Sequence, residues 1–361
     1  MEGKNSAYTK QYNRRRVLSL LQRSPLSRAE LSRQMGLTRA AISLITEELI
    51  TEGLICPSEK AMQVTGPGRT PINLELCRGA LFAVGVNLSR SGAWVGMEDL
   101  TGNVLCQEQV AQQTPEGLIA AISKIIANIP KEKIIGIGIS SPGPVDSASG
   151  TILNPPAFSH WSNCPIGTLL RNTLGLPVYL EKDANAAALF NRRNGDFPEK
   201  DDFLLLYMGG GVGSGVISQG KLLRFCELGH TSIGHDGPVC SCGNRGCLEA
   251  YAAIPNLLKQ FGYRSWEELM ASPKAAQVLS MEADYLATAI SNCANMIPIG
   301  AVLLDGKMLT CSDRLLPLIA QRLQGRCISG TVPRLLPALS GPHARLQSAC
   351  SIVFSHYLEE E

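Results

Sequence analysis

Three thiols lie within eight residues of one another in the second half of the chain, at Cys240, Cys242 and Cys247, and His230 lies ten residues before the first of them. Two glycines between the last two thiols allow the backbone to turn tightly there. Three thiolates and one imidazole make a closed set of four ligands, the usual composition of a structural zinc site. The spacing therefore predicts a structural Zn²⁺ ion, which any fold of this chain has to accommodate.

Other interpretations of these residues stay open at this level. His235 lies five residues before Cys240 and competes with His230 as the fourth ligand. A coincidence of three nearby cysteines is a second alternative. A disulfide is disfavoured because nothing in the chain indicates an oxidising compartment. A catalytic zinc ion would keep one position open for water, and this set of four ligands leaves none.

The residues around these ligands carry a family resemblance. The chain reads Glu227-x-x-His230 and then Cys-x-Cys-Gly-x-x-Gly-Cys-Leu-Glu, which ends at Glu249. This pattern resembles the signature of the ROK family, a family of repressors and sugar kinases. The resemblance implies that the histidine binds zinc, and that the same histidine and the two glutamates line a sugar pocket.

Length and composition limit the class of protein. A chain of 361 residues suits two or three domains. With 45% hydrophobic and 18% charged residues it is globular, and the nine other cysteines are expected to be buried thiols. The longest apolar run, near 294–304, is too short to span a bilayer, and the N-terminus lacks the apolar core of a signal peptide. We expect a cytoplasmic protein without a membrane partner.

Charge is distributed unevenly along the chain. Residues 1–78 hold 12 Lys and Arg against 7 Asp and Glu, whereas the remainder holds 21 against 24. A basic head on a mildly acidic body indicates that the head meets a polyanion. The alternative is that the excess of basic residues in the head is an ordinary feature of a protein surface and has no polyanionic partner.

The first 78 residues have the pattern of a helix-turn-helix domain. Apolar residues at helical spacing predict a first helix over 13–21. Ser27 and Glu30 form a capping box that opens a second helix. After a short turn containing glycine, Thr38 caps a third helix that ends near Gly53. Helix, tight turn and helix is the layout that places its second helix in the major groove of DNA.

Small and polar side chains mark the outward part of the third helix. Arg39 is suited to a bidentate contact with guanine or to a phosphate contact. Arg14, in a run of three arginines, is suited to phosphate. The predicted DNA-contacting residues are Arg14, Thr38, Arg39, Ala40, Ser43 and Arg69.

Residues 54–76 have the pattern of a hairpin wing, and Arg69 follows Gly68 as in ROK repressors, where it would reach the minor groove. The alternative is a three-helix protein-interaction module. ROK sugar kinases lack such a head, so its presence favours a regulator. We therefore predict a winged helix-turn-helix domain over 1–78 and a ROK domain over 79–361.

The body has the element order of an α/β protein. Three strands, a helix and a strand over 81–140 resemble the first lobe of the two-lobed actin-like (ASKHA) fold. The resemblance implies a first lobe over about 79–190, completed by a C-terminal helix within 343–361. The second lobe then covers about 191–342.

Two of the nucleotide motifs of ROK kinases look eroded. Where the kinases carry Asp-x-Gly-x-Thr, this chain has 87–91, Asn-Leu-Ser-Arg-Ser. Asparagine has no charge to help hold magnesium, and Leu88 and Ser89 bring side chains to a place that needs close phosphate approach. The adenosine loop at 302–308 keeps a single glycine, whereas the glycine-rich loop within 204–215 is preserved.

The sugar-facing motifs depart from the family pattern at a few positions. Asp183 stands where the kinases keep their general base, and a helix N-cap is a compatible second role. Lys182 replaces a sugar-binding asparagine, and a cation there would lower the pKa of the adjacent carboxylate. Ala157 stands where another sugar-contacting asparagine is expected, so that Asn154 or His160 would have to compensate.

Together these patterns predict a sugar-sensing transcriptional repressor that binds a double-stranded DNA operator as a homodimer or homotetramer. The predicted ligands of a sugar or sugar phosphate, held between the lobes, are Asp183, Glu227, His230 and Glu249. No catalytic residue is expected, and Asp183 is a vestigial base. The alternatives are a ROK sugar kinase with residual ATP-dependent activity and a regulator controlled by a partner protein.

Overall fold

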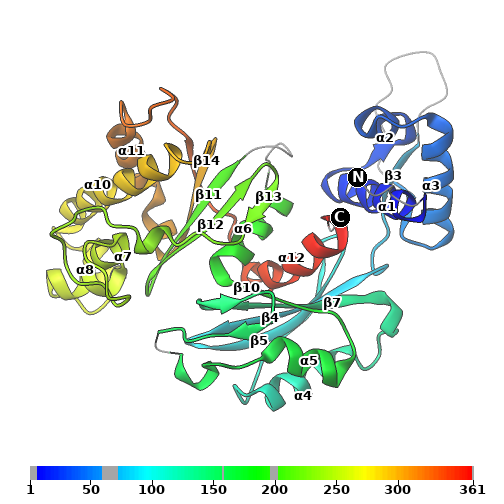
Figure 1. The fold of residues 1–361 in the computed structure, drawn as a ribbon, viewed down its shortest axis with the longest axis horizontal. Coiled ribbons are helices and arrows are strands. Elements are labelled where there is room, and N and C mark those ends of the chain that lie inside the picture. Colours follow the sequence, from blue (N-terminus) through cyan, green and yellow to red (C-terminus); the bar gives the residue numbers. More distant parts are fainter. Residues whose placement is uncertain (1–5, 59–71, 157, 196–201, 360–361) are drawn as a thin grey trace. The chain divides into compact units, whose positions relative to one another are not determined.

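The fold is given by a computed structural model that describes residues 6–58, 72–156, 158–195 and 202–359. The chain divides into two compact units, one of residues 1–182 with 345–361 and the other of residues 183–344. The first unit contains the head and a first lobe, and the second unit contains a second lobe (Figure 1). Among the described residues, no helix is long and apolar enough to cross a membrane.

The head follows the predicted helix-turn-helix order. Ser27 and Glu30 each accept a hydrogen bond from the other's backbone N–H, so the predicted capping box is present. Thr38 caps the third helix by accepting from the N–H of Ala41, and Gly36 makes the preceding turn with a φ of 67°. The elements are α1 (Ser6–Arg23), β1 (Leu26–Ser27), α2 (Arg28–Met35), α3 (Arg39–Thr51), β2 (Ile55–Pro57) and β3 (Asn73–Leu76), with the strands in the order β1-β3-β2.

One apolar core joins the head to the first lobe. Val17 of α1 and Ile42 of α3 are fully buried in it. From the lobe it receives Phe354 and Leu358 of the C-terminal helix α12 (Ala344–Glu359). Because apolar burial stabilises by about 25 cal/mol per Å², a shared core ties the head to the lobe.

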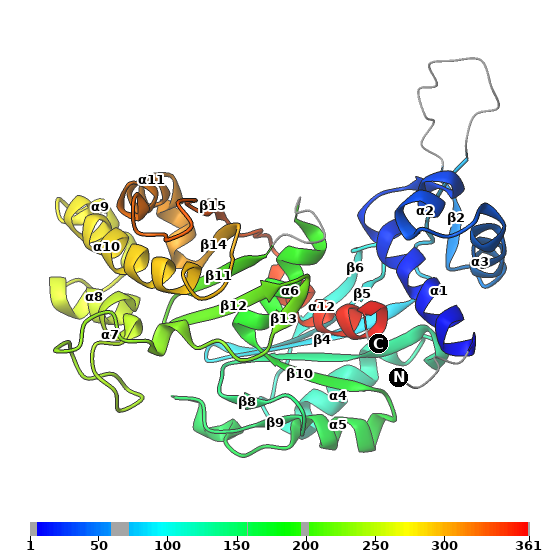
Figure 2. The same ribbon diagram turned by 45° about the horizontal axis from the view of Figure 1, so that its top comes forward.

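The first lobe is an α/β layer structure. Its strands lie in the order β10-β7-β4-β5-β6, with β4 antiparallel to β5 and parallel to β7. Figures 1 and 2 show α4 and α5 on one face of this sheet and α12 on the other. The elements are β4 (Phe82–Ser89), β5 (Gly92–Asp99), β6 (Val104–Gln109), α4 (Pro115–Ile126), η1 (Lys131–Lys133), β7 (Ile134–Ser141), β8 (Val145–Asp146), β9 (Thr151–Ile152), η2 (Ser159–Trp161), α5 (Ile166–Leu174) and β10 (Val178–Lys182).

The C-terminal helix packs directly on the first-lobe sheet, as predicted. A Cβ atom at Gly138 of β7 would lie 2.0 Å from the carbonyl oxygen of Ala349, and one at Gly85 of β4 would lie 2.8 Å from Leu346 and Cys350. Glycine is therefore required at both strand positions for α12 to approach so closely.

The second lobe repeats this strand order. Its sheet has the order β13-β12-β11-β14-β15, so each lobe places its first strand centrally, with a hairpin on one side and parallel strands on the other. The elements are α6 (Asp183–Asn194), β11 (Phe203–Met208), β12 (Val212–Ser218), β13 (Lys221–Leu223), η3 (Leu228–His230), α7 (Leu248–Ala252), α8 (Ile254–Phe261), α9 (Trp266–Ala271), α10 (Ala275–Ala294), β14 (Ala301–Gly306), η4 (Lys307–Cys311), α11 (Ser312–Leu323) and β15 (Arg334–Pro337).

The two faces of the second sheet are covered differently. Leu204, Leu206 and Met208 of β11 point into the large core formed with the helices that follow β13. Helix α6 packs on β11 and β12 and groups with this unit, although the expected first lobe extended to residue 190. The duplicated strand order and the helical layers confirm the predicted actin-like α/β body.

Candidate metal centre and neighbouring carboxylates

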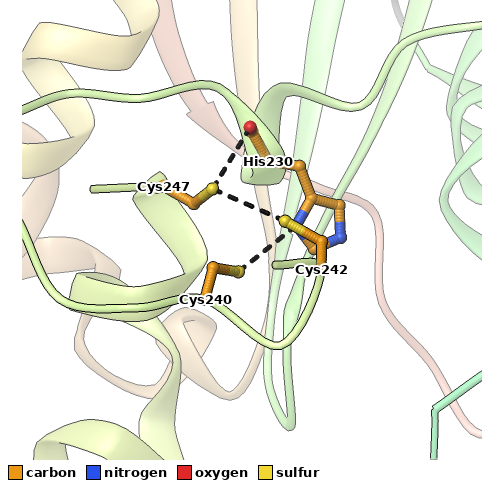
Figure 3. Close-up of side chains that lie close together, drawn as sticks. All are labelled: His230, Cys240, Cys242 and Cys247. Carbon is orange, nitrogen blue, oxygen red and sulfur yellow. Dashed lines mark hydrogen bonds between the residues drawn. The ribbon is translucent and has the colours of Figure 1, made fainter. Parts of the chain in front are cut away.

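The predicted metal ligands converge in the second lobe. The ligand atoms of His230, Cys240, Cys242 and Cys247 all lie within 4.8 Å of one another. Figure 3 shows the three sulfur atoms and the imidazole grouped around one point. The Nδ1 atom of His230 lies 3.6 Å from the Sγ atom of Cys240, and the Sγ atoms of Cys242 and Cys247 lie 3.8 Å apart. The cluster can hold a metal ion.

These separations match the edges of a tetrahedron. With metal–sulfur and metal–nitrogen distances of about 2.3 and 2.05 Å, tetrahedral angles give edges of about 3.8 Å between two sulfurs and about 3.6 Å between sulfur and nitrogen. The observed values of 3.8 and 3.6 Å fit both edges. The donor set and these two separations therefore suit a closed four-ligand site.

Backbone hydrogen bonds shape the loop that carries the thiols. The N–H of Cys240 donates to the carbonyl of Asn244 at 2.8 Å, and the N–H of Ile233 donates to that of Gly246 at 2.8 Å. Gly246 has a φ of 68°, and a Cβ atom there would lie 1.6 Å from the carbonyl oxygen of Gly234. Only glycine fits this position, which explains the second glycine of the motif.

The competing histidine lies outside the cluster. The Nε2 atom of His235 is 3.0 Å from the Oδ2 atom of Asp236, and the side chain of His235 is 92% exposed. The structure therefore groups His230, and not His235, with the three thiols.

The three thiols depend on a cation to ionise together. Burial, with the neighbouring thiols Cys242 and Cys240, raises the pKa of Cys247 to about 12. The pKa of Cys242 is lowered, chiefly by a backbone hydrogen bond from Asn244. Three thiolates this close repel one another, so that a bound cation is what allows all of them to act as ligands.

The start of β12 organises the predicted sugar ligands. The N–H of Val212 donates to the Oε2 atom of Glu249 at 3.0 Å. A Cβ atom at Gly229, between Glu227 and His230, would lie 2.1 Å from the carbonyl oxygen of Val212. Two chain segments that are remote in sequence thus meet at one residue of the strand.

Asp183 lies at the same end of this strand. It begins α6, and its Oδ1 atom accepts a hydrogen bond from the N–H of the next residue, Ala184, at 2.8 Å. The Cβ atom of Ala184 would lie 3.2 Å from a Cβ atom on Gly213, the residue after Val212. The structure therefore brings the segments that carry all four predicted sugar-binding residues to the first two residues of β12.

The metal loop and the carboxylate site are joined through Glu249. This residue lies two positions after Cys247, on α7. Its Oε1 atom accepts a hydrogen bond of 3.4 Å from the hydroxyl of Ser241, which lies between two of the thiols. Sequence reasoning placed Glu249 beside sugar but missed its bond to the backbone of β12, because that bond joins residues far apart in the chain.

Helix α3 is the helix predicted to enter the major groove, and is called the reading helix below. It presents most of the predicted DNA-contacting residues to solvent. Arg39 and Ala40 are exposed and Ser43 is half-buried, whereas the hydroxyl of Thr38 serves as the helix cap. Sequence reasoning missed Leu44, which is 64% exposed on the same helix. The sequence signal for it was that Leu44 does not belong to the helically spaced apolar residues Ile42, Ile45 and Leu49, which are buried. Arg69 and Ala157 lie outside the described residues.

Arg14 makes ion pairs inside the head. Its guanidinium binds Glu48 at 3.1 Å and also binds Glu52, and Lys10 binds Glu48 at 2.7 Å. The pKa of Arg14 is raised by these carboxylates against the opposing effect of burial. Its predicted phosphate contact stays a prediction, and the observed contacts fasten α1 to α3.

The first-lobe hairpin is closed by its own side chains. Ser89 donates a hydrogen bond of 2.8 Å to the carbonyl of Gly92, and Arg90 donates to the carbonyl of Pro156 at 2.9 Å. Asn87 is buried, and its Oδ1 atom has no hydrogen-bond partner among the described residues. The hairpin thus has no carboxylate at Asn87.

Curated relatives resemble the chain over most of its length. The xylose repressor of Caldicellulosiruptor bescii is 32% identical over 290 residues, covering 73% of this chain and 72% of that protein. The xylose repressor of Bacillus subtilis is 27% identical over 384 aligned residues, covering 99% of both. The second of these matches includes the head as well as the body.

Solved structures give the same picture. A ROK family transcriptional regulator, described as a homologue of the Escherichia coli MLC protein, superimposes with a TM-score of 0.80 at 24% identity and covers 97% of both chains. A ROK hexokinase from Thermus thermophilus superimposes with a TM-score of 0.66 at 27% identity, covering 75% of this chain and 97% of its own. Residues 83–353 match the ROK family itself, and the chain belongs to that family.

Proposed function

We propose that this chain is a DNA-binding repressor of sugar-metabolism genes whose body binds a sugar or sugar phosphate. The observation that carries the proposal is the union of an exposed reading helix with a ROK body that gathers carboxylates beside a metal cluster. The names of the xylose repressors support it, since one of them matches over the whole chain. With DNA as partner, the protein works in the cytoplasm.

The proposed resident ion is a structural Zn²⁺ held by His230, Cys240, Cys242 and Cys247. The donor set and the tetrahedral separations support this choice. When bound, zinc supplies no reaction chemistry here and fixes the loop. Only one ring nitrogen of His230 can face the ion, and Nδ1 is the one beside Cys240. The Nε2 atom is therefore left for a ligand, oriented by the site.

Asp183, Glu227, His230 and Glu249 are the proposed ligand-binding groups. Carboxylates accept hydrogen bonds from sugar hydroxyls, and they are short enough to be held rigidly by the backbone. Glu249 already accepts from Val212, which fixes one of its oxygens and leaves Oε1 with only a long contact to Ser241. Three carboxylate acceptors and the Nε2–H donor of His230 together suit a polyhydroxyl ligand.

Contacts within the first unit offer a route from the body to the reading helix. Tyr179 of β10, three residues before Lys182, stacks on His356 of α12 with ring centroids 4.0 Å apart. The next residue of α12, Tyr357, has the guanidinium of Arg15 5.7 Å from its ring centroid. The ion pairs of Arg14 then tie α1 to α3. A ligand acts through this route only by its difference in affinity for two arrangements.

Residual kinase activity is the second candidate function. The preserved glycine loop after β11 and the likeness to a ROK hexokinase favour it. Asn87, the closed first hairpin and the single glycine at Gly306 argue against it. We propose that the chain is not an enzyme, and that Asp183 takes part in binding alone.

The test combines DNA selection with a ligand screen. Zinc-loaded protein is used to select duplexes from a random library, and sugars and sugar phosphates are then screened by thermal shift. One enriched operator with paired half-sites, weakened by one sugar, is the expected result, together with a dimer or tetramer by light scattering. Failure to enrich any duplex would sink the repressor assignment, and ATP-dependent phosphorylation of a hexose would restore the kinase.

A further inference from the structure

Two cysteines unrelated to the metal cluster face each other at the base of the wing. Cys56 lies in β2, and Cys77 directly follows β3. In the antiparallel register Cys56 is opposite Glu75, while the N–H of Cys77 donates to the carbonyl of Leu54 at 2.9 Å. Because side chains alternate along a strand, Cys56 and Cys77 lie on one face as diagonal neighbours.

An equivalent diagonal on the same face is in direct contact. The hydroxyl of Ser58 donates to the Oε2 atom of Glu75 at 2.7 Å, and these residues are related as Cys56 is to Cys77. The twist of the hairpin therefore draws this diagonal together, and the Cys56 thiol is near enough to contribute to the raised pKa of Cys77. The opposite face carries Ile55, which is buried, so the half-buried thiols lie on the open side.

We propose that Cys56 and Cys77 form an oxidant-sensitive dithiol that closes into a disulfide and alters the junction between head and body. The oxidant is a peroxide. One thiolate attacks a peroxide oxygen and breaks the O–O bond, which gives a sulfenic acid and a hydroxide ion, and this ion takes up the proton that the thiol had released to become water. The sulfur of the second thiol then attacks the sulfenic sulfur, and the S–OH bond breaks with release of a second water. Two thiols and one hydrogen peroxide thus become one disulfide and two waters.

The two thiols have different roles in this reaction. Burial, followed by the neighbouring Cys56 thiol, raises the pKa of Cys77 to about 12. Because the thiolate is the nucleophile, Cys56 makes the first attack and Cys77 resolves the sulfenic acid. Each cysteine is therefore needed for the bridge to form.

The position of the pair gives the bridge a consequence. Cys56 lies in the strand that leaves the reading helix, and Cys77 lies in the connection from the wing to β4. Diagonal neighbours have Cα atoms about 7–8 Å apart, whereas a disulfide requires about 4.4–6.8 Å. Closing the bridge has to draw the two strands together and shift the base of the wing. That this shift changes operator binding rests on the proposed function, whereas bridge formation does not.

The bridge is tested by peptide mapping of the zinc-loaded full chain. Treatment with hydrogen peroxide is expected to yield, under non-reducing conditions, a linked peptide pair containing Cys56 and Cys77 that dithiothreitol separates. C56S and C77S should each abolish the pair, while C106S, at an exposed cysteine of β6, should leave it unchanged. Zinc release, followed with a chromogenic chelator, distinguishes this oxidation from attack on the metal thiols. Absence of the linked pair from the folded wild type overturns the proposal.

A second measurement addresses the consequence. Oxidised wild type is expected to bind the selected duplex roughly tenfold more weakly than reduced protein, a size typical of coupling between sites, and reduction should restore binding. The C56S/C77S double variant should bind equally well before and after peroxide. Unchanged binding by cross-linked wild type would overturn the effect on the junction. Should reduced protein select no duplex at all, the proposed function fails, while the linked peptide still decides the bridge.

Discussion

The two lobes place a hairpin at the same point of the same strand order, yet the two hairpins are built differently. The β4–β5 hairpin turns through Arg90 and Ser91 and closes on itself through Ser89. The β11–β12 hairpin turns through three glycines, and Val212, which follows them, gives its N–H to Glu249. The turn of the second hairpin therefore has no side chains, whereas the turn of the first hairpin carries those of Arg90 and Ser91.

The difference shows what a preserved glycine can mean. A Cβ atom at Gly211 would lie 2.6 Å from the Oε2 atom of Glu249, so this glycine is required by a carboxylate of the protein itself. Within this loop, the glycine at position 211 is therefore explained without a bound nucleotide. The predictions below test the proposed separation between a second lobe that binds a ligand and a first lobe that does not bind nucleotide.

The largest effect is expected from the metal cluster of the second lobe. C247S, or removal of zinc with a chelator, should unfold the loop and abolish sugar binding, since structural zinc contributes on the order of 10 kcal/mol. Because the pKa of Cys247 is raised to about 12 without a cation, protons compete strongly and zinc affinity should fall as pH falls. Zinc content and calorimetry with the sugar measure both. C106S is the control, and undiminished sugar binding by metal-free protein would contradict the assignment.

A pH-dependent stability is expected from one buried carboxyl group of the second lobe. Glu282 of α10 is fully buried and neither oxygen has a hydrogen-bond partner among the described residues, so burial raises its pKa well above 4.5. In the first lobe, the buried Asp99 accepts from the backbone N–H groups of Gly79, Thr101 and Asn103. Among the described residues, Glu282 therefore lacks hydrogen bonds of the kind that Asp99 accepts.

The sign follows from the raised pKa. The folded state keeps the proton of Glu282 while the unfolded chain loses it above pH 4.5, so stability falls by about 1.4 kcal/mol per pH unit from there until the folded pKa is reached. E282Q should remove this slope, and E116Q, at an exposed position, should keep it. Urea unfolding at pH 5, 6 and 7 measures the slope, and parallel curves for wild type and E282Q would refute it.

A substitution in the second hairpin should separate ligand binding from folding. G211A places a methyl group against Glu249 and should displace this carboxylate, lowering sugar affinity by about 1–3 kcal/mol of lost hydrogen bonding. G210A is a matched control, because a Cβ atom there meets nothing within 4 Å. Calorimetric titration of both variants is the measurement. Equal affinities would show that the open hairpin does not serve Glu249.

The smallest effect is expected where the first unit joins the head. Y357L keeps apolar bulk on α12 but removes the ring that faces Arg15, which should cost about 0.5–1 kcal/mol in chemical unfolding. If the route from body to head passes here, the variant should also reduce the effect of sugar on duplex binding while leaving sugar affinity unchanged. An unaltered sugar effect would place the route elsewhere.

Local chemistry made much of the fold predictable. Capping by Ser27, Glu30 and Thr38, the turn glycines and the spacing of the thiols act over a few residues, and the structure has them where expected. The bond between Val212 and Glu249 was not predictable, because it joins residues 37 positions apart. The diagonal that brings Cys56 to Cys77 depends on strand register, and the isolation of Glu282 depends on packing, so neither is encoded in a local pattern.

Helix α12 has a consequence for the order of synthesis. The first unit is discontinuous, because α12 packs on the sheet built from residues 82–182. A ribosome delivers the whole second lobe before it delivers the helix that the earlier sheet needs. The second lobe, made of one continuous stretch, can therefore fold during translation, whereas the apolar surface around Gly85 and Gly138 stays uncovered until α12 has been synthesised.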